Sequence, residues 1–310
     1  EKWAPMAAFF AGACILVAFF GIGTFPQVNA IVDSVNIAFG VPREISDGVI
    51  TILVAAITIG GLQSISHVAS RIVPFMAVVY VVISLGLIFM NISAVPDAIA
   101  LIVHSAFNGQ AAAGGFAGST LMVAMQKGIA RGIFSNESGL GSAPIAAAAA
   151  KTKWPAEQGL ISMTGTFIDT IIICSMTGLA LVLTGVWQGN SAGAMMTTDA
   201  FAFVYGQIGV ALLTISLALF AFTTILGWNY YGERACIYLF GTKGVLPYRF
   251  IFIALVASGA FLKLDAIWTL ADIVNGLMAI PNLVALCALS GVIVSETQRY
   301  MEYREKDDQG

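Results

Sequence analysis

Charged residues are scarce in this chain. Only 10% of its 310 residues are Asp, Glu, Lys or Arg, whereas an ordinary soluble domain carries about a quarter. The 14 basic residues are scattered and the net charge is −3, so the clustered positive surface that tracks a phosphate backbone is lacking and no nucleic-acid partner is expected. Apolar residues make up 58% of the chain, which indicates that lipid surrounds much of the protein.

The residue patterns that support enzymatic chemistry are also lacking. The two histidines, His67 and His104, are not spaced as a pair of helical metal ligands, and the four cysteines form no C-x-x-C motif. No G-x-S-x-G, H-E-x-x-H or phosphate-binding loop occurs in the sequence. We therefore expect the protein not to be an enzyme and to use no organic cofactor.

Long apolar runs dominate what is present. About 20 apolar residues suffice for a helix to cross the hydrocarbon core, and uncharged runs of that order occur at 4–32, 48–66, 73–96, 170–198, 200–232 and 273–295. Less regular segments at 250–262 and 114–150 bring the expected number of crossings to about eight. The sequence predicts an all-α membrane protein with a single transmembrane domain over residues 1–310, and an interfacial helix near 97–107.

The basic residues predict the orientation of the chain in the membrane, since Lys and Arg near helix ends are retained on the cytoplasmic side. With the first residues inside and an even number of crossings, the outer loops receive only Arg43 and Lys263. The other basic residues outside the apolar runs then fall on the inner side. The C-terminus is expected in the cytoplasm, with residues 296–310 as a solvated tail.

The stretch FSNESGLGSAP, residues 134–144, predicts a broken helix. Glycine and serine weaken a helix and free backbone groups. At membrane depth, unwound backbone is tolerated only where it is buried in protein or lines a wet cavity, and in secondary transporters it forms the substrate and ion site. We expect Ser135, Asn136 and Gly139 to contribute to such a site. An ordinary inner loop before a short Ala-rich helix is the alternative.

Two charged residues accompany this break. We expect Glu137 to hold the unwound segment through backbone amides or through Arg131 rather than to touch a solute. Arg131 could pair with Glu137 or with another buried acid, or could face an aqueous vestibule. The structural use is favoured because an unpaired cation inside a bundle is costly.

Asp169 lies within an apolar segment, in GTFIDTIIICSMTG. Hard cations such as sodium take oxygen ligands from carboxylates, hydroxyls and carbonyls. Asp169 together with Thr166 or Thr170 is therefore a candidate sodium site. The alternative is a hydrogen bond that packs two helices.

Polar residues in two further apolar segments are candidates for the same solutes. Thr223 and Thr224 could both face an oxygen-rich cavity that binds sodium, or could bond back to their own helical turn. Trp228 could form the wall of a substrate pocket or anchor the chain at the membrane interface. Gln27 could hydrogen-bond a small zwitterion or join two helices.

The segment GIARGIFSNESGLGSAPIAAAAAKT resembles the signature of the alanine or glycine:cation symporter family. The stretches GTFIDTIIICSMTG, SRIVPFMAVVYVV and TTILGWNYYGERA support the resemblance, which extends over about residues 3–294. It implies a leucine-transporter-like fold with two inverted repeats, sodium-coupled uptake of alanine or glycine by alternating access, and a place in a prokaryotic inner membrane.

The resemblance also implies roles for individual residues. It places the break at 135–141 on the sixth core helix, Asp169 near one sodium site, Thr223 and Thr224 near another, and Gln27 and Trp228 against the amino acid. The family's first, glycine-rich broken helix and its second helix have no counterpart before Trp3, so these helices are expected to be missing. A proton-coupled carrier of the same fold, a passive channel and a non-transporting membrane fragment are the alternatives.

Overall fold

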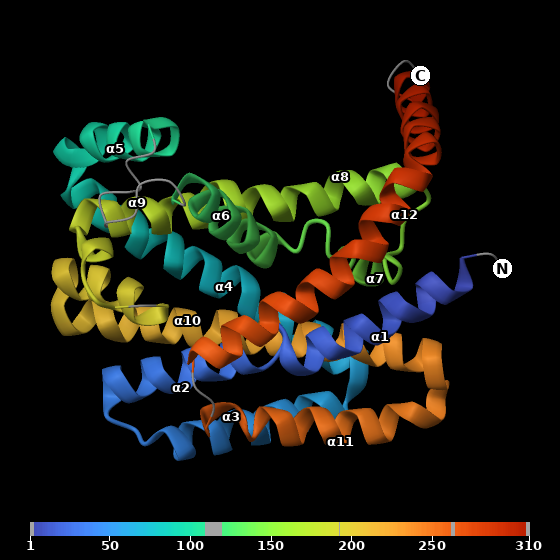
Figure 1. The fold of residues 1–310 in the computed structure, drawn as a ribbon, viewed down its shortest axis with the longest axis horizontal. Coiled ribbons are helices and arrows are strands. Elements are labelled where there is room, and N and C mark those ends of the chain that lie inside the picture. Colours follow the sequence, from blue (N-terminus) through green and yellow to red (C-terminus); the bar gives the residue numbers. More distant parts are fainter. Residues whose placement is uncertain (1–2, 109–119, 192, 262–263, 308–310) are drawn as a thin grey trace.

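The computed structural model describes residues 3–108, 120–191, 193–261 and 264–307, and this part of the chain is mainly helical and contains no strand (Figure 1). The predicted all-α architecture is confirmed. Its helices are α1 (Ala4–Phe20), α2 (Phe25–Phe39), α3 (Arg43–Ile59), α4 (Gly61–Met90), α5 (Val95–Asn108), α6 (Thr120–Asn136), α7 (Ala143–Ala147), α8 (Pro155–Thr166), α9 (Ser175–Thr184), α10 (Ala194–Phe240), α11 (Val245–Val256) and α12 (Leu264–Asp307).

Six helical segments among the described residues are long and apolar enough to cross a membrane: Ala4–Phe39, Gln63–Met90, Pro155–Thr184, Ala194–Phe240, Thr242–Phe261 and Ala266–Lys306. The protein is therefore a multi-pass membrane protein. The segment Ala194–Phe240 has 47 residues, more than the roughly 20 that one crossing needs, and its backbone is non-helical at Gly206. The number of crossings and the inverted repeats stay predictions.

The first apolar run, expected to cross as one helix over residues 4–32, is divided into α1 and α2. The glycines and proline of GIGTFP explain the division. A side chain at Gly23 would come within 2.6 Å of Trp228 Cβ, and Pro26 stands in the first turn of α2, where its missing N–H costs nothing. The Thr24 hydroxyl donates to the Ala18 carbonyl at 2.6 Å and closes the turn.

Two other boundaries differ from expectation. The run expected at 170–198 begins too late, because the helical segment extends from Pro155 to Thr184 and ends at Gly185, whose φ is 71°. The runs expected at 48–66 and 73–96 are separated at Gly60 and Gly61, between α3 and α4. Apolar content does not reveal such a boundary when a glycine turn joins two equally apolar helices.

Helix α10 is the centre of the bundle. It packs against α1, α2 and α4, and α12 crosses α1 on the other side (Figure 1). The main core joins residues of α1, α2, α10 and α12 and of the link between α1 and α2. Among them are Val17, Ile22, Ile225, Trp228 and Met278, each at most 1% exposed. Two helix interruptions, before α2 and before α7, lie beside this core.

The expected tail is a continuation of α12 as far as Asp307. Trp154, just before α8, lies against Tyr300 and Tyr303 with ring centroids 6.0 and 5.1 Å apart. The start of the tail is thereby fastened to the bundle, while the side of the membrane on which it lies stays a prediction.

Candidate functional site

Residues 137–142 interrupt the helical chain between α6 and α7. Glu137, Gly139 and Gly141 have φ angles of 58°, 86° and 89°. Residues other than glycine rarely adopt this region. Glu137 is the exception to that preference, and such strained positions concentrate at functional sites. The predicted interruption near 135–141 is present, but neither α6 nor α7 is among the described segments that are long and apolar enough to cross a membrane. Helix α7 is a short Ala-rich helix, as the alternative of an ordinary loop also predicts, so the place of the break within the membrane stays a prediction.

A polar cluster forms where the end of α6 meets the segment after α8. The Ser135 hydroxyl donates to Asp169 Oδ2 at 2.5 Å, and the Asn136 amide donates to Thr170 Oγ1 at 3.0 Å. The Thr170 hydroxyl lies 3.4 Å from Asp169 Oδ2. Residues predicted separately for substrate and for sodium thus meet in one place.

The segment that carries Asp169 and Thr170 is a π-helix, Phe167–Cys174, between α8 and α9. A π-helix makes wider turns than an α-helix and occurs frequently at functional sites. Here two consecutive side chains both reach α6, which the 100° step of an α-helix would disfavour. The Cys174 sulfur, at the end of the π-helix, lies 3.1 Å from the Ser135 hydroxyl oxygen. Cys174 was not predicted as a site residue.

The donor set of the cluster fits a hard cation. Its groups are a carboxylate, two hydroxyls and an amide, and oxygen ligands of these kinds suit sodium. Among the side chains that the structure describes, Asp169 has hydroxyl partners and no ion-pair partner. Thr166, predicted as an alternative ligand, ends α8 just before the π-helix and forms no hydrogen bond with Asp169 among the described contacts.

The Glu137 carboxylate bonds other protein side chains, but these partners differ from those predicted. The Trp228 indole N–H donates to its Oε1 at 3.1 Å, and the Ser142 hydroxyl donates to its Oε2 at 2.5 Å. The expectation that backbone amides or Arg131 hold Glu137 is wrong. Through the bond from Trp228, the Glu137 side chain fastens the unwound segment to α10.

Arg131 pairs instead with Asp272 of α12, and both side chains are half-buried. Its guanidinium also lies over the rings of Trp268, 4.5 Å from the centroid, and Phe134, 5.0 Å away. The alternative of another acid is therefore the correct one. Sequence reasoning did not identify Asp272 or Trp268, because 141 residues separate Arg131 from Asp272.

Trp228 is completely buried. Its ring meets that of Tyr231 edge-on with centroids 5.3 Å apart, and the Gly23 backbone packs against its Cβ. An interfacial anchor would be exposed at the surface of the bundle, so this alternative is excluded. Trp228 therefore contacts both helix interruptions, at Gly23 and at Glu137.

The other predicted residues lie outside the polar cluster. The Thr223 and Thr224 hydroxyls bond the Phe220 carbonyl at 2.9 and 3.0 Å, within their own helix. The Gln27 amide bonds the Ile22 carbonyl at 3.1 Å and spans the first interruption. These bonds satisfy the hydrogen-bond donors, while the hydroxyl lone pairs of the threonines stay available to accept.

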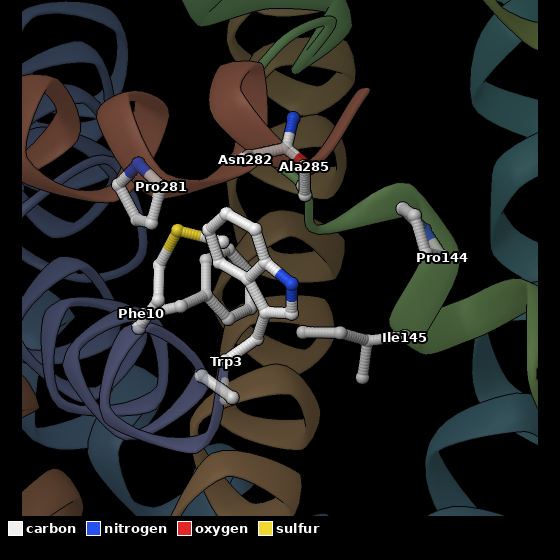
Figure 2. A pocket seen from close by; sticks show the side chains of 10 residues that line it. Trp3, Phe10, Pro144, Ile145, Pro281, Asn282 and Ala285 are labelled. Carbon is white, nitrogen blue, oxygen red and sulfur yellow. The ribbon is translucent and has the colours of Figure 1, made fainter. Parts of the chain in front are cut away.

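A cavity of about 380 Å³ borders the unwound segment. Figure 2 shows it between Trp3, just before α1, Phe10 of α1, Pro144 and Ile145 of α7, and Pro281, Asn282 and Ala285 of α12. Asn282 donates from its amide to the Gly139 carbonyl at 2.9 Å. It was not predicted, because a single Asn in a long apolar segment gives no signal of its own.

Comparison with known proteins identifies related chains. The model of the sodium:alanine symporter family matches residues 1–310. An uncharacterized transporter of Haemophilus influenzae is 58% identical over 97% of this chain and 66% of its own length. The sodium/alanine symporter AgcS of Methanococcus maripaludis is 46% identical over 94% of this chain and 64% of its own.

A third relative differs in the amino acid that its name gives. The probable sodium/glutamine symporter GlnT of Bacillus subtilis is 35% identical over 98% of this chain and 63% of its own length. The chain thus spans just under two thirds of the length of these relatives. The family match extends over the whole chain and gives no support to the expectation of missing first helices.

Proposed function

Because the chain belongs to the sodium:alanine symporter family, we propose that it is a carrier in which sodium entry drives the uptake of a small neutral amino acid. Alanine is the proposed substrate, and glycine is the next candidate. The observation that carries the proposal is the cluster of Asp169, Ser135, Asn136 and Thr170 beside an unwound helix. The name of the Methanococcus relative, a sodium/alanine symporter, supports the choice of both solutes.

The proposed sodium site uses Asp169 as its negative charge. Ser135 and Thr170 already direct hydroxyls to this carboxylate. A hydroxyl that turns its proton away presents lone pairs to a cation, so the same side chains could coordinate sodium after a small rotation. Thr166, Thr223 and Thr224 are proposed as further oxygen ligands, the last two at a second position on α10.

The proposed amino-acid site is the unwound segment itself. A zwitterion needs donors for its carboxylate and acceptors for its ammonium group, and interrupted helices supply both from the backbone. Gly139 leaves the backbone open to close approach, while Ser135 and Asn136 join this segment to the sodium cluster. Gln27 and Trp228 are proposed to face the substrate from the first interruption and from α10.

Coupling then follows from the shared cluster. Sodium bound at Asp169 would order Ser135 and Asn136, and with them the end of α6 that the amino acid contacts. Each solute stabilises the arrangement that the other requires, which is free-energy linkage. Alternating access in a plasma membrane, with the C-terminus in the cytoplasm, completes the proposal.

Uptake of labelled alanine into proteoliposomes tests this function. We expect uptake above equilibrium with an inward sodium gradient, and its loss when choline or potassium replaces sodium. Asp169→Asn keeps the size of the side chain and removes its charge, so we expect the sodium concentration for half-maximal uptake to rise about tenfold or more.

Asp97→Asn is the matched control, since it removes an exposed carboxylate on α5 and should leave sodium activation unchanged. Uptake that follows a proton gradient without sodium would replace sodium coupling by proton coupling. Uptake that never exceeds equilibrium would identify a passive pore. Normal sodium activation in folded Asp169→Asn protein would remove Asp169 from the site.

A further inference from the structure

Asn282 connects α12 to the unwound segment at the point where both are irregular. It follows Pro281, which lies inside α12 and removes one hydrogen bond of that helix. The Asn282 amide reaches a residue 143 positions away in the sequence, donating to the Gly139 carbonyl at 2.9 Å. The Gly139 carbonyl lies outside any helix and accepts from no backbone N–H among the described contacts, so the Asn282 amide is its partner.

The peptide group between Gly139 and Leu140 is thereby held at both ends. Its carbonyl accepts from Asn282, and its N–H, on Leu140, donates to the Glu137 carbonyl at 3.1 Å. Since a peptide group is planar, two such bonds fix the orientation of the whole unit. The peptide groups on either side of it are those proposed to bind the solute, and their orientation depends on this fixed unit.

The side chain of Asn282 also fits closely against the segment. A Cβ at Gly141 would lie 2.8 Å from Asn282 Cγ and 2.8 Å from its Oδ1. Glycine at 141 is thus required both by its φ of 89° and by the approach of Asn282. The two glycines of GLG accommodate one amide side chain, one through a hydrogen bond and the other through contact.

From this geometry we propose that Asn282 is a positioning residue for the amino-acid site. It sets the direction of the backbone groups at 139–141 and does not itself contact the solute. The inference deepens the proposed function and rests on it. Loss of the amide frees the Gly139 carbonyl, and the segment then presents its groups to the substrate in several orientations.

The Asn282→Ala and Asn282→Leu variants test the proposal. Both remove the donor, and Leu keeps the branched shape and the number of heavy atoms of the side chain. We expect each to raise the alanine concentration for half-maximal uptake about tenfold while the maximal rate stays within about twofold. The affinity for sodium measured without amino acid should stay within about twofold, because Asp169 and its partners lie on the π-helix and α6. These magnitudes correspond to the loss of one ordering interaction.

Asn282→Gln is the conservative variant. It retains the amide donor, and the cavity of about 380 Å³ that Asn282 lines has room for the added methylene. We expect it to restore the alanine half-saturation to within about threefold of the wild type. Ser290→Ala is the matched control on the same helix, since that hydroxyl bonds only the Cys287 carbonyl of its own turn, and it should change nothing.

The outcomes separate the two levels of the proposal. If the wild type accumulates alanine with sodium while Asn282→Leu has a normal half-saturation, the positioning role is wrong and the carrier function stands. The same conclusion follows if Asn282→Gln is impaired as much as Asn282→Leu in monodisperse protein. If the wild type accumulates no amino acid under any sodium gradient, the carrier function fails, and the positioning role fails with it.

Discussion

Gly139 and Gly141 have almost the same backbone conformation but different surroundings. Their φ angles are 86° and 89°, yet a Cβ at Gly139 would meet its nearest neighbour, Leu283, at 3.7 Å, while one at Gly141 would meet Asn282 and Phe10 at 2.8 Å. The pair therefore separates backbone strain from steric overlap.

We predict that Gly139→Ala lowers the free energy of unfolding by about 1–2 kcal/mol, which is the cost of holding an L residue in the left-handed backbone conformation. Gly141→Ala should lose about 1–3 kcal/mol more, because overpacking adds to the same strain. Thermal unfolding in detergent, compared at equal protein and lipid content, measures the difference. Equal losses would show that Asn282 and Phe10 move aside at no cost.

The sequence identifies which residue types matter at this scale better than it identifies their partners. Asp169, Ser135, Asn136 and Thr170 were predicted and lie together. The partners of Glu137 and Arg131 were not predicted correctly, since Trp228 and Asp272 come from helices far away in the sequence. A charged residue in an apolar segment indicates that a partner of opposite charge or a hydrogen-bond partner is needed. Only the packing of the helices decides which residue lies near enough to be that partner.

Helices α10 and α11 are joined by an ion pair that also reaches a third element. Arg249 of α11 donates to the two oxygens of Glu233 on α10 at 2.7 and 3.2 Å, and it contacts the Ile59 carbonyl at the end of α3 at 3.5 Å. The Glu233 side chain is only 7% exposed, so water cannot replace the guanidinium.

We predict that Arg249→Met lowers the free energy of unfolding by about 2–4 kcal/mol, since a buried carboxylate then keeps only Arg234 as its partner. Arg249→Lys should recover part of this loss, because it restores the charge without the forked geometry. Arg299→Met provides the comparison. Its pair with Glu296 is exposed, and its loss should cost at most about 1 kcal/mol. Thermal unfolding that gives equal shifts for Arg249→Met and Arg299→Met would contradict the prediction.

Some helix interruptions can be predicted from the sequence and others cannot. The one at 137–142 is evident from its glycines and serines, whereas GIGTFP lies within the run expected to cross as one helix over residues 4–32 and instead divides α1 from α2. The π-helix Phe167–Cys174 has no signal at all, because FIDTIIIC is as apolar as its neighbours. A π-turn depends on which side chains an adjacent helix offers, and that is a property of the packed bundle.

At the scale of the whole molecule, hydropathy predicts an all-α membrane bundle but not the number of passes. Six segments among the described residues qualify by length and composition, against the eight expected. The difference between six and eight crossings depends on two kinds of helix: long ones such as α10 and short ones such as α6. For each, part of the helix can lie within the membrane and part at its surface. Sequence length and hydropathy leave that division open, since both depend on tilt and on neighbouring helices.

The carrier function predicts that the two solutes bind cooperatively. Saturating sodium should tighten alanine binding by about tenfold, and saturating alanine should tighten sodium binding by the same factor, because linkage is reciprocal. Titration of the purified protein by calorimetry, in choline and in sodium, measures both factors. Asp169→Asn should bring the two factors close to one, and independent binding in the wild type would contradict the proposed coupling.

The position of Trp228 has a mechanical consequence. Its Cβ is pressed against the backbone at Gly23, and its indole nitrogen is attached to Glu137. One buried side chain therefore contacts both helix interruptions, so a displacement of the segment at Gly23 would be transmitted to the segment at Glu137 through Trp228.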